Sequence, residues 1–399
     1  MRSLLLGLLM LLIGMGPARA ASQRPTADTT AATASASSSV LSDPFVRTTG
    51  KAGLDSLYNM QFEAARTRFD AIDARYPNHP VGSFLNGLNI WWRIMLDLTD
   101  TSHDAAFLEA MNETIARSED LLDDNPDHFD ATFFKGAALG FRGRLRSNRG
   151  KWLKAALDGK RAIGYVRDIA EQAPENDDYV FGKGMYDYYA AIIPEEYPIS
   201  KAVMWMMPDG DKQRGLRLLR RSATEGWYIQ TEATYFLAQI HYLYEDNFPA
   251  ARRYVQQLRE RHPNNPYFHL FEGRVLARWG YWDRAADVFA DVVERRRQDA
   301  AGYTVHMEEV ARLYLARSRL YAHAYDEALI HLAHLEALTS RTPDDPKYRV
   351  LGYLYQGMVY DAMGRRDMAV SRYRRVLRMD DSSGAHDRAE RYLDTPYGE

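Results

Sequence analysis

Residues 268–292 read FHLFEGRVLARWGYWDRAADVFADV, and this stretch decides the fold. Its small and bulky residues recur at intervals of three and four, which places them on one face of each of two helices. Gly280 lies between the two runs, at a position where a helix can end. The stretch therefore predicts two helices that pack against each other as a hairpin. The positions that carry this interpretation are Gly273, Leu276, Gly280, Trp282, Ala285, Phe289 and Val292.

The second half of this pattern returns at a fixed distance from a proline. A small residue stands twelve places before the proline, a bulky one eight before and an aliphatic one five before. The small residue lets two helices approach closely, and the proline cannot continue the helix. A fixed internal period predicts a solenoid of stacked helix pairs. The sets are Ala65, Phe69, Ile72, Pro77; Ala162, Val166, Ile169, Pro174; and Ala251, Val255, Leu258, Pro263.

The pattern resembles the tetratricopeptide repeat (TPR) family, whose unit of about 34 residues carries W-x-x-L-G-x-x-Y, then A-x-x-x-F, then Pro. Residues 268–292 are one close copy, and residues 351–379 are a second. The second copy is marked by Gly357, Tyr360, Gly364, Ala369, Tyr373 and Val376. Poorer copies have a glycine at the same place in their first helix: Gly87, Gly136 and Gly184. A further second helix is marked by Ala328, Leu332 and Leu335. The resemblance covers residues 41–377 and implies an all-α fold, a right-handed superhelical solenoid of about eight TPR-like helix pairs.

We expect the solenoid to occupy residues 45–381, and residues 382–399 to form a capping helix, at Ala385–Leu393, and a tail. The spans Gly87–Pro126 and Gly136–Pro174 are about fourteen residues longer than the family spacing allows, so they require long helices or inserted loops.

An irregular insertion is expected at about residues 190–212, because Pro194 and Pro198 interrupt the helical pattern there. Within it, Val203–Met207 is an apolar run that includes Trp205. One interpretation is a docking strip for a partner, a ligand or a membrane surface, and the favoured one is an extra helix packed over the solenoid.

Residues 1–20 have the features of a signal peptide: Arg2, an apolar run from Leu4 to Met15, and Ala18-Arg19-Ala20 as the cleavage pattern. An uncleaved anchor is the alternative, but the run is shorter than the roughly 20 residues of a spanning helix. We expect no transmembrane segment after cleavage. Residues 21–44, rich in Ala, Ser and Thr, are expected to form a flexible tether. These features predict a periplasmic or secreted protein.

The composition excludes several classes of function. The chain has no cysteine, so it forms no disulfide and uses no thiol chemistry. Without residues 1–20 the basic residues fall from 51 to 49, against 54 acidic ones, and no basic stripe is present. We therefore expect no nucleic-acid partner.

The resemblance also implies that side chains of each pair's first helix line a concave groove. An aromatic floor beside arginines would suit a peptide with carboxylates. The alternative, weighed equally, is that the aromatic residues fill helix-pair interiors and the arginines keep the surface soluble. The set of Lys and Asn positions by which chaperone-binding members hold a peptide carboxylate does not recur. The candidate partner-binding residues, with Trp205, are Phe133, Phe141, Phe181, Tyr188, Tyr189, Tyr244, Tyr267, Arg274, Arg278, Arg317 and Tyr321.

Enzyme signatures are missing from the sequence: it contains no HExxH, GxSxG or nucleotide fingerprint. His331 and His334 lie three apart on a predicted helix, but no motif supplies further metal ligands, so we interpret them as exposed histidines. We expect no cofactor and no metal. The predicted function is a non-enzymatic scaffold for proteins or peptides of the cell envelope. The alternatives are a carrier for an apolar small molecule or lipid near Trp205, and an uncatalogued hydrolase.

Overall fold

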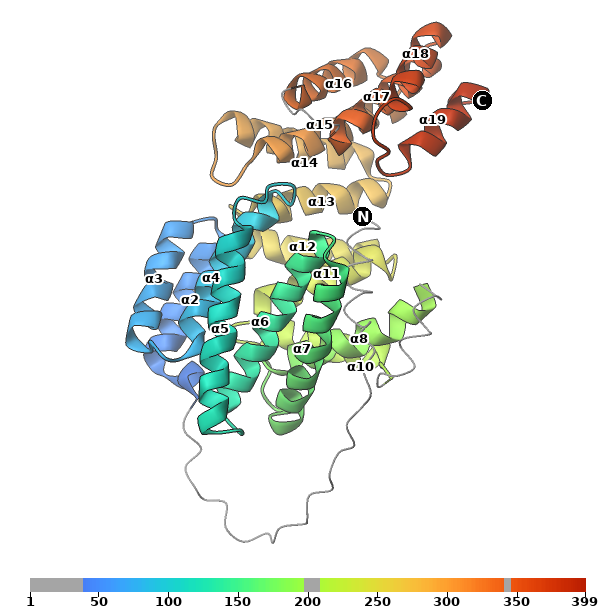
Figure 1. Ribbon diagram of the computed structural model, residues 1–399. Coiled ribbons are helices and arrows are strands. Elements are labelled where there is room, and N and C mark those ends of the chain that lie inside the picture. The colour runs from blue at the N-terminus through green and yellow to red at the C-terminus, as the bar shows by residue number, and fades with distance from the viewer. Residues whose placement is uncertain (1–38, 197–208, 341–345) are drawn as a thin grey trace. The chain divides into compact units, whose positions relative to one another are not determined.

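The computed structural model describes residues 39–196, 209–340 and 346–399 (Figure 1). Within these residues the chain forms one short 3-10 helix and 17 α-helices and contains no strand. The helices follow one another as eight pairs and a final single helix. The 3-10 helix is η2 (Val40–Ser42), and the pairs are α2 (Pro44–Tyr58) and α3 (Phe62–Arg75); α4 (Pro80–Leu96) and α5 (Asp104–Asp124); α6 (Phe129–Asn148) and α7 (Trp152–Gln172); α8 (Val180–Glu196) and α10 (Lys212–Glu225); α11 (Gln230–Leu243) and α12 (Phe248–Arg261); α13 (Pro266–Arg278) and α14 (Trp282–Arg297); α15 (Val305–Tyr321) and α16 (Tyr325–Thr339); and α17 (Lys347–Ala362) and α18 (Arg366–Val376), followed by α19 (Ala385–Asp394).

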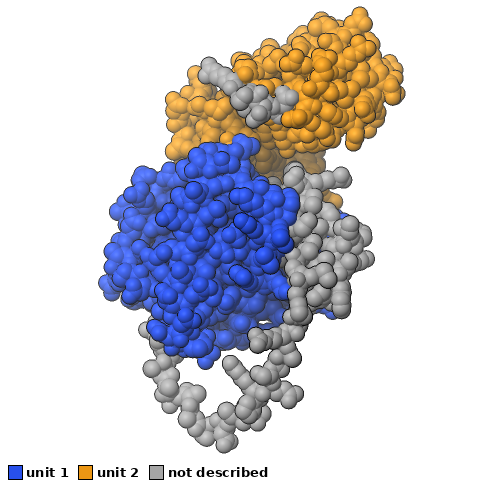
Figure 2. Space-filling model, in the orientation of Figure 1, with its two compact units in different colours: residues 1–94, 98–237 blue, residues 95–97, 238–399 orange. Residues whose placement is uncertain are grey.

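The chain divides into two compact units (Figure 2). Unit 1 comprises residues up to Ile94 together with Leu98–Leu237, and unit 2 comprises Met95–Asp97 and Ala238–Glu399. The two helices pack against each other in the pairs α2–α3, α6–α7, α8–α10, α13–α14, α15–α16 and α17–α18. The second helix of one pair packs on the first helix of the next at α5–α6, α7–α8, α12–α13, α14–α15 and α16–α17. The prediction of an all-α array of about eight helix pairs is confirmed.

A glycine on the first helix makes room for an aromatic ring on the second in the regular pairs. A Cβ atom at Gly273 would lie 2.7 Å from Cζ of Phe289, closer than real Cβ contacts come. Gly53 meets Phe69 and Gly357 meets Tyr373 in the same way. The glycine and the aromatic residue are the same number of residues apart in all three pairs, and this constant spacing is why the repeat can be recognised in the sequence.

Asparagine and proline between pairs end one helix and begin the next. Helix α12 ends at Arg261, His262 is its C-cap residue, and Pro263 follows. The side chain of Asn265 then accepts hydrogen bonds from the backbone N–H groups of Tyr267 and Phe268, and Pro266 is the first residue of α13. Both residues suit a helix start, because proline lacks the donor that would be unpaired there and asparagine supplies an acceptor.

The two long units contain long helices. α5 and α7 have 21 residues each and α6 has 20, compared with 13 in α13 and 16 in α14. A Cβ atom at Gly136 in α6 would lie 2.9 Å from Cβ of Tyr165 in α7. A glycine of the first helix therefore again meets an aromatic residue of the second, although the two are further apart in the sequence than in the regular pairs.

The fourth pair differs from the expectation in its first helix. Pro194 does not interrupt α8, which continues to Glu196 with the proline in its last turn. Residues 197–208, which contain Pro198, Trp205 and Val203–Met207, lie outside the described residues. α8 and α10 are joined by the buried carboxylate of Asp187, to which the Arg214 guanidinium donates hydrogen bonds of 2.6 and 2.8 Å.

The described residues begin before the predicted tether boundary at residue 44. Ser39 Oγ donates to Oδ1 of Asp130 at 2.6 Å, and the Val40 N–H donates to Oδ2 of the same carboxylate at 2.8 Å. Tyr228 donates its hydroxyl hydrogen to the Leu41 carbonyl at 2.8 Å. Residues 39–44 are therefore part of unit 1. The predicted signal peptide and residues 21–38 lie outside the described residues.

The last helix, α19, packs on α17 and α18. Ala385 and Ala389 of α19 are fully buried in a hydrophobic core formed by α15 to α18. Arg366 of α18 donates hydrogen bonds to the backbone carbonyls of Tyr392 and Leu393 at 2.8 and 2.6 Å, which holds the end of α19 in place. Among the described helices, none combines the length and the apolar character that crossing a membrane requires.

Candidate functional site

The first helices of the pairs in unit 2 lie side by side. α13 contacts α15, α15 contacts α17, and α17 contacts α19, in addition to the contacts within each pair. Side chains that leave these four helices on their shared face therefore form one continuous surface. Its members come from four separate stretches of sequence.

Arg317 of α15 is surrounded by aromatic rings on this surface. Its guanidinium carbon lies 4.9 Å from the ring centre of Trp282, 5.1 Å from that of Tyr314 and 5.5 Å from that of Tyr355. A guanidinium over an aromatic face gains about 0.5–2 kcal/mol, more where water is excluded. The Nε atom of Arg317 is buried and has no hydrogen-bond partner among the described residues.

Arg388 of the capping helix continues the arrangement. Its guanidinium carbon lies 5.2 Å from the ring centre of Tyr355, the same ring that Arg317 approaches. Tyr355 thus stands between two cations from different helices. We call the set Arg274, Tyr314, Arg317, Tyr355 and Arg388 the arginine–tyrosine row.

Arg274 of α13 forms the other end of the row. Tyrosine side chains lie around it, and Tyr348 has the largest electrostatic effect on it among them. Burial raises the pKa of Tyr348, so this phenol stays neutral and keeps its hydrogen at physiological pH. The remaining tyrosines near Arg274 are Tyr242, Tyr267 and Tyr314.

The row carries positive charge that no carboxylate balances. In the described part of the chain, no ion pair joins Arg274, Arg317 or Arg388 to an acidic side chain. Two half-buried arginines of unit 1 differ in being paired: Arg142 with Asp158 at 2.7 Å and Arg149 with Asp104 at 2.6 Å. Because a guanidinium loses hydration when it is partly buried, a cation without a carboxylate leaves donors available to an external acceptor.

The structure brings together several of the predicted binding residues in unit 2. Arg274 and Arg317 lie in the row, and Tyr321 lies at its edge, 40 % exposed and edge-on to Trp282 at 4.7 Å. Tyr267 is half-buried near Arg274, and Tyr244 is half-buried in the turn after α11. Arg278 differs: it is exposed but pairs with Asp246 at 2.8 Å. The sequence reasoning missed Tyr314, Tyr355 and Arg388, although Tyr314 lies one helical turn before Arg317.

The predicted residues in unit 1 mostly fill the interior. Tyr188 is fully buried and Tyr189 is 8 % exposed, so the expectation that they line a groove was wrong; they pack edge-to-face at 5.3 Å within the core. Phe133, Phe141 and Phe181 are half-buried and make ring contacts with neighbouring helices, for example Phe181 with Phe236 at 5.7 Å. The alternative that such aromatics fill helix-pair interiors fits this unit better.

Unit 1 also contains a buried acid that the sequence did not reveal. Glu232 of α11 is 5 % exposed and accepts hydrogen bonds from Trp92 Nε1 at 3.2 Å and Tyr58 Oη at 3.4 Å. Burial raises the pKa of Glu232, and the nearby Arg144 charge opposes that effect. Because both hydrogen bonds end on its Oε1 atom, Glu232 links α11 to α2 and α4, all three of which are first helices of their pairs.

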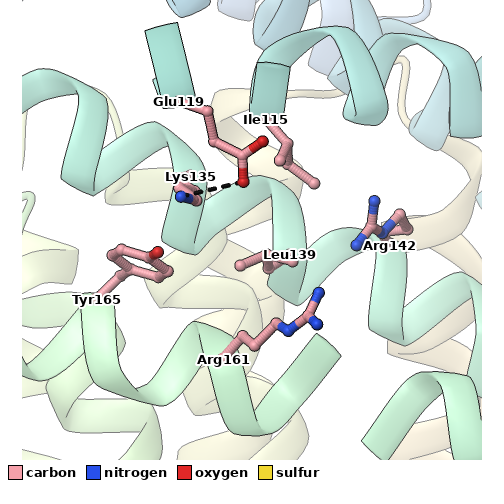
Figure 3. A pocket seen from close by; sticks show the side chains of 7 residues that line it. All are labelled: Ile115, Glu119, Lys135, Leu139, Arg142, Arg161 and Tyr165. Carbon is pink, nitrogen blue, oxygen red and sulfur yellow. Dashed lines mark ion pairs between the residues drawn. The ribbon is translucent and has the colours of Figure 1, made fainter. Parts of the chain in front are cut away.

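A hollow of about 310 Å³ lies between α5, α6 and α7 of unit 1 (Figure 3). Lys135 forms an ion pair across it with Glu119 at 3.1 Å, and Arg142 is held by Asp158. The charges that face this space are thus largely balanced by the protein itself, unlike those of the row. The lining residues are Ile115, Glu119, Lys135, Leu139, Arg142, Arg161 and Tyr165.

Among the described residues, no three or more His, Cys, Asp or Glu side chains are placed so that they could hold a metal ion. His331 is half-buried, which corrects the expectation of an exposed residue, and it lies beside Arg312, whose Nη1 is 3.5 Å from its Nδ1. Burial and the positive charges of Arg312 and Arg319 lower the pKa of His331 to about 4. The carrier alternative depended on Val203–Met207, which lies outside the described residues.

Consecutive helix hairpins, several of which share a glycine–aromatic contact, define an all-α helical-repeat protein. Residues 352–383, which span α17 and α18, match the family model of the tetratricopeptide repeat. Helices α17 and α18 therefore carry a tetratricopeptide repeat, and this fold is typical of scaffolds that bind other proteins.

No curated protein matches the chain. Among solved structures, the TPR domain of P58(IPK) aligns with 89% of this chain and 99% of its own, at 14% identity and a TM-score of 0.26. At that TM-score the likeness supports no argument about this chain.

Proposed function

We propose that this chain is a non-enzymatic scaffold that holds a segment of another protein on the arginine–tyrosine row of unit 2. The supporting observation is that three guanidinium groups from α13, α15 and α19 lie on one surface without carboxylate partners among the described residues. Two of them share a tyrosine ring. Arginine and tyrosine are the side chains that contribute most to protein contacts, because they combine apolar area with directional donors.

The dimensions of the row suit an extended segment. Packed helices lie about 10 Å apart, so a surface over four helices is on the order of 30 Å long. An extended peptide of about nine residues covers that length. Acidic side chains on such a segment would reach the guanidinium groups, and its apolar side chains would lie beside the half-buried ring of Tyr314, since Tyr355 is only 5 % exposed.

The cell envelope is the proposed location of this function. The motivation is the signal-peptide pattern in residues 1–20, with its cleavage motif at Ala18-Arg19-Ala20. The proposal predicts that the mature protein begins after Ala20 and fractionates with the periplasm or medium. Intact mass spectrometry of the protein from its own cells tests this, and a cytoplasmic chain that keeps Met1–Ala20 would contradict it.

The binding surface can be tested by crosslinking in cells. A photoreactive residue at Tyr321, which is exposed at the edge of the row, should capture a recurrent envelope protein. The double variant Arg317→Ala/Arg388→Ala should lose that product, because both cations are removed while the helices keep their buried faces. Arg374→Ala is the matched control, since Arg374 is exposed on α18.

Circular dichroism should show that both variants keep the helical content of the parent protein. Equal capture by the parent and the double variant would contradict binding at the row. A defined lipid or apolar compound recovered from the purified protein, with no crosslinked protein, would instead support the carrier alternative.

A further inference from the structure

We propose that the hollow between α5, α6 and α7 of unit 1 is a binding site for a small organic anion, a free carboxylate that carries a short apolar chain or ring. Arg161 is the residue that binds the carboxylate group. The site belongs to unit 1, so it is independent of the arginine–tyrosine row and of any partner that the row holds. Its binding can be measured without knowing such a partner.

Three helices supply the lining of the hollow at regular intervals. Ile115 and Glu119 lie four residues apart on α5, and Arg161 and Tyr165 lie four apart on α7. Because residues three or four apart share one face of a helix, each of these pairs points to one side of its helix. The volume of the hollow, about 310 Å³, is near the lower end of the range for ligand sites and suits a small molecule.

The lining has one cation more than its own carboxylates pair with. Lys135 pairs with Glu119 at 3.1 Å, and Arg142 pairs with Asp158 at 2.7 Å. Arg161 is exposed and forms no ion pair with any residue that the structure describes. A bound monoanion would therefore balance a charge that the protein itself leaves without a partner.

The two ends of the hollow differ in charge. Figure 3 shows the Leu139 side chain between the Lys135–Glu119 pair at one end and the guanidinium groups of Arg142 and Arg161 at the other. Glu119 is the one acidic side chain among the lining residues, and it lies at the lysine end. A carboxylate bound at the arginine end is thus kept away from Glu119.

The buried acid at the arginine end already serves two cations. Asp158 accepts hydrogen bonds from Arg142 at 3.0 and 2.7 Å and another from Arg146 at 2.5 Å. One carboxylate thus faces two guanidinium groups, and Arg161 adds a third without an acid of its own. A guanidinium has five N–H donors and can give two of them to the two oxygens of one carboxylate, and within the described residues Arg161 has made no such bond.

Apolar surface lies beside the arginine end. Ile115 and Leu139 line the hollow, and the Tyr165 ring also faces it, with the Lys135 ammonium 5.0 Å from the ring centre. A short chain or ring attached to the carboxylate would cover these side chains and remove water from them. An inorganic anion has no such part, so we expect the hollow to prefer an organic one.

The first test is a calorimetric titration of the full chain with benzoate at neutral pH. Benzamide is the neutral comparison of nearly the same shape, and acetate is the anion without an apolar part. We expect saturable benzoate binding with a Kd on the order of 1 mM and affinities about tenfold weaker for both comparisons. Equal binding of benzamide would overturn the anion assignment, equal binding of acetate would overturn the role of the apolar wall, and no saturable benzoate binding would overturn the site.

Variants locate the binding. Arg161→Gln should weaken benzoate affinity by about tenfold, and Arg161→Lys by a smaller factor, because lysine keeps the charge but cannot pair with both carboxylate oxygens as a planar guanidinium does. Arg220→Gln is the matched control, since Arg220 is exposed on α10 of the same unit and does not line the hollow. Because Arg161 is exposed, its replacement leaves the buried face of α7 intact. Unchanged benzoate affinity in Arg161→Gln would overturn the site.

A peptide separates a free anion from the carboxylate end of a protein. The tripeptide Gly-Gly-Phe with a free carboxylate should bind no more tightly than benzoate if the hollow takes a small molecule, and tenfold tighter binding would overturn that assignment. The scaffold proposal fails or stands separately, because it is read from crosslinking at Tyr321. Arg161→Gln should lose benzoate binding and keep the crosslinked product.

Discussion

The ring of Phe289 stacks on the ring of Tyr314, with their centres 4.6 Å apart and their planes 21° from parallel. Phe289 occupies the space left by Gly273, and Tyr314 supports Arg317 in the arginine–tyrosine row. A residue that the repeat pattern requires for packing therefore also positions a residue of the proposed binding surface.

Replacing Gly273 with alanine should destabilise unit 2. The added Cβ atom would lie within 3 Å of the Phe289 ring, so α13 and α14 would have to separate or the ring would have to move. We expect a loss of about 1–3 kcal/mol in the free energy of unfolding, measured by urea denaturation.

The double variant Gly273→Ala/Phe289→Leu isolates the contact. Because the smaller side chain relieves the overlap, the two changes should cost less together than the sum of their separate costs. Strict additivity would show that the glycine is required for another reason.

Replacing Gly140 with alanine should have the opposite effect. Gly140 lies inside α6, and an added Cβ atom there meets nothing within 4 Å. Alanine restricts the unfolded chain and favours the helix, so we expect a gain of about 0.5–1 kcal/mol, seen as a higher urea midpoint. A loss of stability would mean that α6 has a close neighbour at this position.

Asp158 should be essential for the stability of the third pair. It is 2 % exposed and accepts bidentate hydrogen bonds from Arg142 at 3.0 and 2.7 Å, and another from Arg146 at 2.5 Å. Asp158→Ala leaves two arginines without this carboxylate, and we expect a loss of about 3–5 kcal/mol. Glu63→Ala removes an exposed carboxylate that pairs with Arg66 at 3.9 Å and with Arg93 at 2.9 Å, and it should cost less than about 1 kcal/mol. Thermal unfolding of both variants measures the contrast.

His331 should make the protein less stable at mildly acidic pH. Its folded-state pKa of about 4 lies below the unfolded value of 6.5. Between these values the unfolded chain binds more protons, so stability falls as the pH is lowered from 6.5 towards 4. After allowance for solvent screening the effect is about 1–2 kcal/mol. His331→Gln should lose less stability than the parent between pH 7 and pH 5 in urea titrations; identical losses would contradict this assignment.

The pairing of helices was predictable because it is local. Gly357 meets Tyr373 and Gly273 meets Phe289 across one short turn, and both partners belong to the same hairpin. In the long pairs the same reasoning predicted extra length but did not predict which residues meet. Gly136 reaches Tyr165 only because α6 and α7 are each extended by more than a turn.

The sequence by itself determined the all-α fold and the repeat of helix pairs, since periodicity reports how a helix meets its immediate neighbour. It also identified Arg274 and Arg317 as surface candidates. Only the tertiary structure decided that Tyr355 stands between Arg317 and Arg388, and that Tyr188 is buried. The distance between side chains on first helices of successive pairs depends on helix crossing angles, and these follow from the packing of the pairs rather than from the spacing along one helix.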